Sequence, residues 1–335
     1  MKPLLLRLLL ALVLALTQRS APAHDAIGFV PAPVLPGGFV VPLFAPDSPS
    51  LRHDRIGERE QYNTTHTVPS ARVQSVIGIH NPSIEVHLSG ASTGAAVIVA
   101  PGGGHRILWV GPEGADLVSF FAQHGVATVI LRNRLRVDGY EPTVDAVNDA
   151  LQAVRIVRAR AKEWKLDPEK IGIMGFSAGA ELAAWAAIDY NRAVPANDPL
   201  AAVSARPSFV TLVYPGPSPF AKGATPSIPD DVPPSFITSP GSGDQVHALW
   251  ATEYFTAMLT RGVPNLEMHI YGNGVHAGGI KDRGGIPFGT WHYRFVEWFR
   301  DLGFLQAPSL PTKAATDVAA YAAKRAANPA GTAKP

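Results

Sequence analysis

A serine, an aspartate and a histidine, which together can form a nucleophilic site, each follow a predicted strand. Ser177 lies in Gly175-Phe176-Ser177-Ala178-Gly179, between the apolar run 170–174 and the helix-forming run 180–188. This order is typical of a G-x-S-x-G nucleophile elbow, whose glycines let the strand and helix pass closely while the serine hydroxyl stands clear of the sheet. We therefore predict that Ser177 is a nucleophile; the alternative is a buried serine in an apolar turn.

A serine hydroxyl needs a base within hydrogen-bond reach and a carboxylate that orients this base. Asp244 follows the predicted strand 235–239, and His276 follows the predicted strand 266–271. Both would lie at the carboxyl ends of parallel strands, where such sheets place their ligands. We predict His276 as the base and Asp244 as its partner; the alternatives are a helix N-cap for Asp244 and a surface loop for His276. The other candidate acids and bases have less suitable positions: Asp230, Asp231, Asp282, His247, His269 and His292.

Three consecutive glycines directly after the apolar strand 95–100 could stabilise an oxyanion. Their lack of side chains leaves backbone N–H groups accessible, and a tetrahedral oxyanion needs two or three such donors held in place. By position we assign the amides of Gly103 and Gly104, together with that of Ala178, which follows the nucleophile. A plain turn or a phosphate-binding loop is the alternative, although G-x-G-x-x-G is absent.

The elements that must position these residues alternate along the chain. Strands are expected at 95–100, 127–131, 171–175, 209–214, 235–239 and 266–271, and helices at 114–124, 143–164, 180–190, 247–261 and 291–299. This alternation predicts an α/β fold with a mostly parallel sheet and helices on both faces. Residues 72–88 are expected to form two antiparallel strands joined at Asn81-Pro82.

The two ends of the chain differ from this core. Residues 1–23 have a basic start, an apolar stretch and a small-x-small site, so we predict a signal peptide cleaved after Ala23 and export to the periplasm or the medium. Residues 24–70 are expected to form a Pro-rich arm, 71–305 the catalytic domain, and 306–335 an Ala-rich tail with one short helix at 317–326.

Charge and cysteine content exclude several classes of protein. Cleavage after residue 23 would remove Lys2, Arg7 and Arg19 from the 29 basic residues, leaving 26 against 27 acidic ones. A nearly neutral chain does not indicate nucleic-acid binding or a polybasic membrane patch. The absence of cysteine excludes disulfides, a thiol nucleophile and a zinc-thiolate site. We expect no cofactor, no catalytic metal and no stable membrane insertion; the oligomeric state stays open.

Several short motifs in order carry a resemblance to a known family. They are Val41 to Phe44, Ile79 to Val86, Pro101 to His105, Gly111 to Gly114, Leu131 to Leu135, the elbow, Ser242-Gly243-Asp244 and His276. With these motifs the chain resembles serine α/β-hydrolases of the bacterial acetylxylan-esterase type, over roughly residues 42–304. The resemblance implies an α/β-hydrolase fold, a Ser177, Asp244 and His276 triad, and acetylated sugars as a substrate class.

Two departures from the family pattern bear on the substrate. This chain has Ala180-Glu181-Leu182 where Gly-His-Leu is common, and His105 where Tyr is common. We expect Glu181 to support the elbow by hydrogen bonding. His105, Arg106, Trp109 and Arg134, with Arg132, are candidate substrate contacts; packing for Trp109 and ion pairing for the two later arginines are the alternatives.

Taken together, these features predict an exported serine carboxylesterase that hydrolyses short acyl esters of small molecules or oligosaccharides. The alternatives are a peptidase of the prolyl-oligopeptidase type, which shares the fold and triad order, and a non-catalytic binding protein. Such a peptidase usually carries a large additional domain, and binding proteins generally lose a triad residue. This chain retains all three triad residues.

Overall fold

The structure is a computed structural model that describes residues 28–65, 72–195, 197–281 and 287–328. The predicted signal peptide and its cleavage site at Ala23 lie outside the described residues. Among the described helices, none has both the length and the apolar character needed to cross a membrane.

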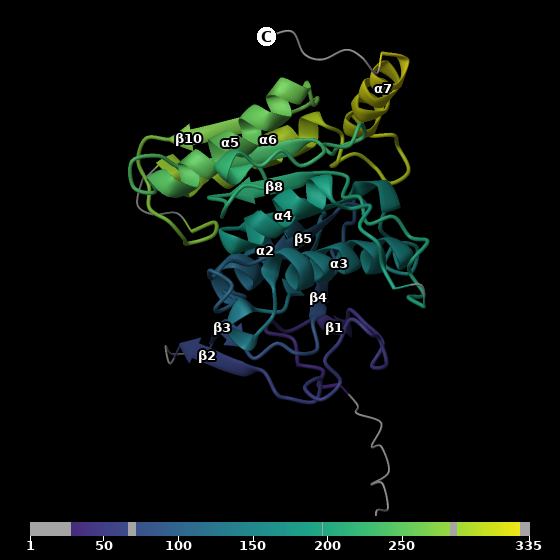
Figure 1. The fold of residues 1–335 in the computed structure, drawn as a ribbon, viewed down its shortest axis with the longest axis vertical. Helices are drawn as coiled ribbons and strands as arrows, with labels where there is room; N and C mark the ends of the chain where they lie inside the picture. Colours follow the sequence, from purple (N-terminus) through teal and green to yellow (C-terminus); the bar gives the residue numbers. More distant parts are fainter. Residues whose placement is uncertain (1–27, 66–71, 196, 282–286, 329–335) are drawn as a thin grey trace, which may run out of the picture.

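An eight-stranded sheet forms the centre of the molecule, in the order β1-β4-β6-β5-β7-β8-β9-β10 (Figure 1). From β6 to β10 every neighbouring pair is parallel, whereas β4 runs antiparallel to both β1 and β6. The strands are β1 (Phe39–Pro42), β4 (Ser83–His87), β5 (Ala96–Ala100), β6 (Ala127–Arg132), β7 (Ile171–Phe176), β8 (Val210–Val213), β9 (Ser235–Pro240) and β10 (Glu267–Tyr271).

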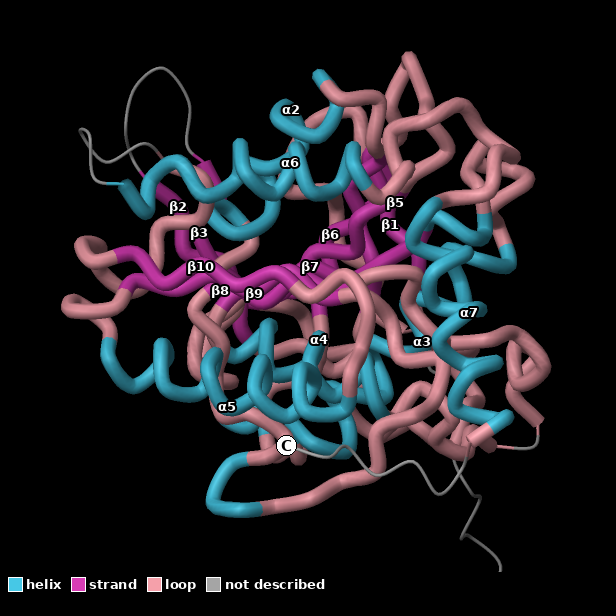
Figure 2. The backbone as a smooth tube through the Cα atoms, turned by 90° about the horizontal axis from the view of Figure 1, so that it is seen from above, coloured by secondary structure: helices cyan, strands magenta, loops and turns pink. Residues whose placement is uncertain are grey.

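Helices cover both faces of the sheet, as Figure 2 shows, with α2 and α6 on one face and α3, α4 and α5 on the other. Alternate residues of each strand point to opposite faces of the sheet and pack in two hydrophobic cores. Ile98 of β5 packs in the core under α3 and α4, and its neighbours Val97 and Val99 pack in the core under α2 and α6. The helices are α2 (Asp116–Gln123), α3 (Val147–Ala159), α4 (Ala178–Ile188), α5 (Gln245–Arg261), α6 (Trp291–Asp301) and α7 (Lys313–Ala327). The predicted mostly parallel sheet with helices on both faces is confirmed.

The predicted pairing within residues 72–88 is wrong. β3 (Arg72–Ile77) pairs with β2 (Gln61–Thr65) in a separate two-stranded sheet, and β4 lies between β1 and β6. Gly78, at φ +74°, redirects the chain between β3 and β4. Every residue of β4 is buried, so this strand needs neighbours on both edges, whereas β3 is partly exposed and suits a peripheral ribbon.

Both predicted terminal regions contribute regular structure. The segment 24–70, expected to be an extended arm, supplies the edge strand β1, where Pro42 is tolerated because one side of the strand lacks a partner. In the tail, α7 begins four residues before the expected helix, because the Thr312 side chain accepts a hydrogen bond from the Ala315 amide and caps its first turn.

Candidate active site

Ser177 sits on a sharp turn between β7 and α4. Its backbone has φ 52° and ψ −118°, outside the usual regions for a residue with a side chain. A Cβ atom on Gly175 would lie 2.2 Å from the Gly179 carbonyl oxygen, and one on Gly179 would lie 2.0 Å from that of Ala100. Only glycine fits at these two positions, so the local sequence forces the elbow and leaves Ser177 at its apex.

The three residues of the predicted triad lie in hydrogen-bond contact. His276 Nε2 is 2.9 Å from Ser177 Oγ, and His276 Nδ1 is 2.7 Å from Asp244 Oδ2. Ser177 follows β7, Asp244 follows β9 and His276 follows β10, so three loops at the same end of the sheet supply the site. In this arrangement His276 Nε2 can take the serine proton while its Nδ1–H donates to the carboxylate.

The carboxylate of Asp244 does not cap a helix. Asp244 is the N-cap residue of α5, yet its side chain makes no capping hydrogen bond. Of the competing acids, Asp230 pairs with Arg261 and Arg325, and Asp231 with Arg206; Asp282 lies outside the described residues. Neither described competitor contacts His276.

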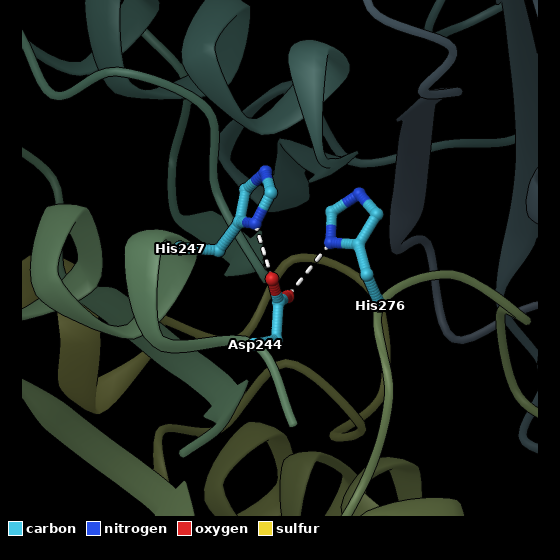
Figure 3. Close-up of side chains that lie close together, drawn as sticks. All are labelled: Asp244, His247 and His276. Carbon is cyan, nitrogen blue, oxygen red and sulfur yellow. Dashed lines mark hydrogen bonds and ion pairs between the residues drawn. The ribbon is translucent and has the colours of Figure 1, made fainter. Parts of the chain in front are cut away.

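His247, considered only as a competing base, lies beside the triad. Its Nδ1 is 2.5 Å from Asp244 Oδ1, so one carboxylate binds two histidines through its two oxygens (Figure 3). Burial lowers the pKa of His247, and the Asp244 hydrogen bond opposes that effect only in part. The spacing of three residues at the start of a helix is the sequence signal that could have indicated this contact.

The glycine loop passes directly over the nucleophile. A Cβ on Gly102 would lie 2.8 Å from Ser177 Cβ, which shows how closely the two backbones approach. Gly103 and Gly104 have φ values of +129° and +64°, conformations that favour glycine. Within the described part of the chain, no group accepts a hydrogen bond from the amides of Gly103, Gly104 or Ala178. The amides of Gly103, Gly104 and Ala178 stay the predicted oxyanion donors.

Glu113 is a functional candidate that the sequence analysis did not single out. It is 2% exposed, and its carboxylate accepts hydrogen bonds from the Gly102 amide at 2.7 Å and from the Tyr214 hydroxyl at 2.8 Å. The Tyr214 ring also packs edge-on against His276, with centroids 4.8 Å apart. Glu113 and Tyr214 thus connect the glycine loop to the loop that carries His276.

The two departures from the family pattern contact each other. His105 Nε2 lies 2.9 Å from Glu181 Oε2, and both side chains are buried. Glu181 therefore makes a supporting hydrogen bond beneath the elbow, as expected, and it ties the end of the glycine loop to α4. The Nε2 atom of His105, which was a candidate substrate contact, is engaged in this hydrogen bond. Arg106 is exposed and Trp109 half-buried, and both stay candidates for substrate contact.

Arg132 and Arg134 make the ion pairs that were the alternative to substrate binding. Arg134 is 2% exposed, and its Nη2 lies 2.7 Å from Asp149 Oδ1. Arg132 is fully buried, with its Nη2 2.6 Å from Glu85 Oε2. Both guanidinium groups are buried in ion pairs inside the protein. The surroundings of Arg134 therefore do not support a role in substrate binding.

The sheet order, the elbow and the triad define a protein of the α/β-hydrolase fold. Solved structures of this fold confirm that class. An acetyl ester-xyloside bifunctional hydrolase from Caldicellulosiruptor lactoaceticus aligns with a TM-score of 0.64 at 23% identity, covering 82% of this chain and 99% of that one. An esterase from Thermogutta terrifontis aligns with a TM-score of 0.57 at 21% identity, covering 69% and 91%.

Sequence comparisons confirm the resemblance to acetylxylan-esterase-like proteins. A family model described as BD-FAE matches residues 88–208. An acetylxylan esterase of Xylanibacter ruminicola is 26% identical over 255 residues, which cover 68% of this chain and 48% of that protein. Endo-1,4-beta-xylanase B of Butyrivibrio fibrisolvens is 30% identical over 120 residues, covering 36% and 19%. The chain thus spans about half of the first relative and a fifth of the second.

Proposed function

We propose that this protein is a serine carboxylesterase that acts through an acyl-enzyme. The observation that carries the proposal is the continuous chain from Ser177 Oγ through His276 to Asp244, with bonds of 2.9 and 2.7 Å. Ser177 attacks the ester carbonyl while His276 accepts its proton, and Asp244 stabilises the resulting imidazolium. The amides of Gly103, Gly104 and Ala178 receive the oxyanion. His276 then returns the proton to the leaving alcohol, and water hydrolyses the acyl-enzyme.

The substrates that we propose are short-chain acyl esters, with acetylated saccharides as the natural class. The printed names of the relatives, an acetylxylan esterase and an acetyl ester-xyloside hydrolase, support this choice. The exposed Arg106, just beyond the glycine loop, suits a hydroxyl-rich alcohol better than a lipid tail. An apolar site with room for long chains gains about 0.8 kcal/mol per buried methylene, so chain length distinguishes the two kinds of site.

Ser177→Ala tests the chemistry. We expect kcat for p-nitrophenyl acetate to fall about a millionfold, because triad residues act as a unit. Ser119→Ala, at an exposed position on α2, is the matched control and should retain wild-type turnover. A fluorophosphonate should label the wild-type protein at Ser177. Labelling of another serine, or activity of a few per cent in the Ser177 variant, contradicts the proposal.

A substrate panel tests the specificity. The kcat/KM for p-nitrophenyl acetate should exceed that for p-nitrophenyl octanoate. The enzyme should also release acetate from acetylated xylo-oligosaccharides. Preference for octanoyl contradicts the short-acyl proposal, and missing acetate release restricts the protein to a general esterase. Cleavage of an aminoacyl-proline amide above the esters would favour the peptidase alternative.

The proposal includes export of the protein. Its support is the pattern of residues 1–23, with the small-x-small site at Ala21 to Ala23. N-terminal sequencing of protein recovered from the periplasm or the medium should begin at His24. Recovery of an intact N-terminus from the cytoplasm alone contradicts export.

A further inference from the structure

Two histidines stand side by side on the carboxylate of Asp244. The rings of His247 and His276 stack with centroids 3.9 Å apart and planes 25° apart, and each Nδ1 bonds a different oxygen of Asp244. Figure 3 shows the second nitrogen of each ring on the side facing away from the carboxylate. His276 is the proposed base, whereas the proposed reaction gives no role to the second nitrogen of His247.

The shared carboxylate determines which nitrogen of each ring carries a proton. A carboxylate accepts hydrogen bonds, so both histidines donate from Nδ1 and keep a lone pair on Nε2. Histidines that bind metal ions are commonly held in the same way, with one ring N–H on a carboxylate and the other nitrogen on the metal. Among the described residues, Ser177 contacts Nε2 of His276 and none bonds Nε2 of His247. Two oriented lone pairs therefore lie next to each other.

The donor atoms suit one transition-metal ion. Zn²⁺ binds imidazole nitrogen at about 2.0–2.1 Å, so two nitrogens on one tetrahedral ion lie about 3.3 Å apart. The rings stack with centroids 3.9 Å apart and planes 25° apart, so their Nε2 lone pairs run nearly parallel, and the two rings must splay apart for both lone pairs to meet one ion. One potential ligand atom from each of Asp244, His247 and His276 lies within 4.8 Å of the others. Imidazole favours Zn²⁺ and Cu²⁺, whereas Mg²⁺ and Ca²⁺ favour oxygen ligands.

We propose that His247 and His276 form an inhibitory binding site for a divalent transition-metal ion such as Zn²⁺, through their Nε2 atoms. Water or the Ser177 hydroxyl completes the coordination. A bound ion uses the lone pair with which His276 must accept the Ser177 proton, so it stops the reaction without covalent change. The inhibition rests on the proposed esterase function; the binding of the ion does not.

Binding is measured on the Ser177→Ala variant, which needs no activity. Isothermal titration with Zn²⁺ should give one site, and Co²⁺ should give the visible absorption of a tetrahedral nitrogen-bound ion. His247→Phe keeps a stacking ring but removes one ligand, and His247→Gln is a second variant that preserves polarity. With either substitution added to Ser177→Ala, the dissociation constant for Zn²⁺ should rise by about a hundredfold or more. His269→Phe, on β10 and bonded to Glu267, is the matched control and should bind Zn²⁺ normally.

Inhibition is measured on the wild-type protein with p-nitrophenyl acetate. Zn²⁺ should inhibit reversibly, EDTA should restore turnover, and Mg²⁺ should have no effect. The inhibition constant should rise in His247→Phe by the same factor as the dissociation constant. Absence of Zn²⁺ binding to Ser177→Ala, or equal binding after either His247 substitution in a folded variant, overturns the proposal. If wild-type protein has no esterase activity but binds Zn²⁺ through His247, only the proposed function fails.

Discussion

At the scale of residues, the direction of one carboxylate organises the site. Asp244 stands where a helix cap is expected, yet its two oxygens bond His276 and His247 and leave the helix end uncapped. It is 7% exposed, so these bonds form where water competes little. The aspartate therefore has two tasks, since it fixes the tautomer of His276, the proposed base, and holds the ring of His247 against it.

Asp244→Asn tests the first of these tasks. An amide cannot accept hydrogen bonds on both sides, so His276 is expected to adopt the wrong tautomer, with kcat about ten-thousandfold lower by analogy with other triads. Steady-state kinetics with p-nitrophenyl acetate and a circular dichroism spectrum check the prediction. Asp230→Asn, which removes a surface partner of Arg261 and Arg325, is the control. The assignment is wrong if Asp244→Asn is nearly active and Asp230→Asn is inactive.

Glu113→Gln tests a residue that positions the glycine loop. The carboxylate accepts from both the Gly102 amide and the Tyr214 hydroxyl, whereas a carboxamide must turn a donor toward one of them. We expect kcat to fall about ten- to a hundredfold with a smaller change in KM, since displacement of a catalytic group by 1 Å can cost about a hundredfold. Tyr214→Phe removes one of these two bonds and also the bond that the Tyr214 hydroxyl accepts from the Gly279 amide, so it should lower kcat as well. Unchanged kcat in Glu113→Gln would contradict the positioning role.

At the scale of elements, the site depends on backbone segments that touch without side chains between them. The β7–α4 turn packs against the end of β5 through Gly179, and the glycine loop packs against Ser177 through Gly102. Close packing of backbones holds amides in place more rigidly than side chains on a loop could. The His105–Glu181 bond adds a fixed connection between the end of the glycine loop and α4.

Gly103→Ala should disable this arrangement. The added Cβ would lie 1.9 Å from the Ile107 carbonyl oxygen, and the glycine has φ +129°, so the loop must move. Loss of one oxyanion donor costs about a hundred- to a thousandfold in kcat. The comparison variant is Gly104→Ala, which also has a positive φ, +64°, but whose Cβ meets no atom within 4 Å, so the difference between the two variants isolates the collision with Ile107. Wild-type kcat in a folded Gly103→Ala variant would show that Gly103 does not position an oxyanion donor.

At the scale of the whole molecule, buried charges join the N-terminal segments to the sheet. Glu85 of β4 binds Arg132 of β6 and accepts hydrogen bonds from His87 and from the amides of Val34 and Leu35. Burial alone would raise the pKa of Glu85, but these bonds and the Arg132 charge together hold it below its ordinary value of 4.5. An ionised Glu85 therefore stabilises the folded chain.

Acid should weaken this connection. Because the pKa of Glu85 is lower in the folded than in the unfolded chain, its contribution is present above pH 4.5 and is lost as the pH falls through the folded-state pKa. Urea unfolding from about pH 7 to about pH 3 should show a steeper loss of free energy in wild-type protein than in Glu85→Gln. Glu60 also pairs with Arg132, but burial raises the pKa of Glu60, so its contribution to the pH dependence of stability has the opposite sign. The contribution of Glu85 is therefore obtained from the difference between wild-type protein and Glu85→Gln. Identical pH dependence in both proteins would contradict the prediction.

The parallel part of the sheet could be predicted because its strands are continuous apolar runs that alternate with helical periodicity. The antiparallel part could not, since alternation identifies a strand but not its partner, and β3 joins β2 rather than β4. The contact of Ser177, His276 and Asp244 could be predicted from their positions after three strands, and their catalytic roles stay a prediction. Glu113 and the burial of Arg134 could not be predicted, because each depends on contacts between segments that only the folded chain brings together. The contact of His247 with Asp244 is local, and its three-residue spacing was a signal that the sequence analysis did not use.

The proposed base is carried by the strand at the open edge of the sheet. β7, β8, β9 and β10 add to one another in the same order in space as in the chain, and Ser177 and His276 are 99 positions apart. A chain that has formed the elbow but not yet docked β10 holds a serine without a proton acceptor. The proposed turnover therefore requires a docked β10, so its recovery on refolding would report completion of this edge of the sheet rather than formation of the nucleophile's own surroundings.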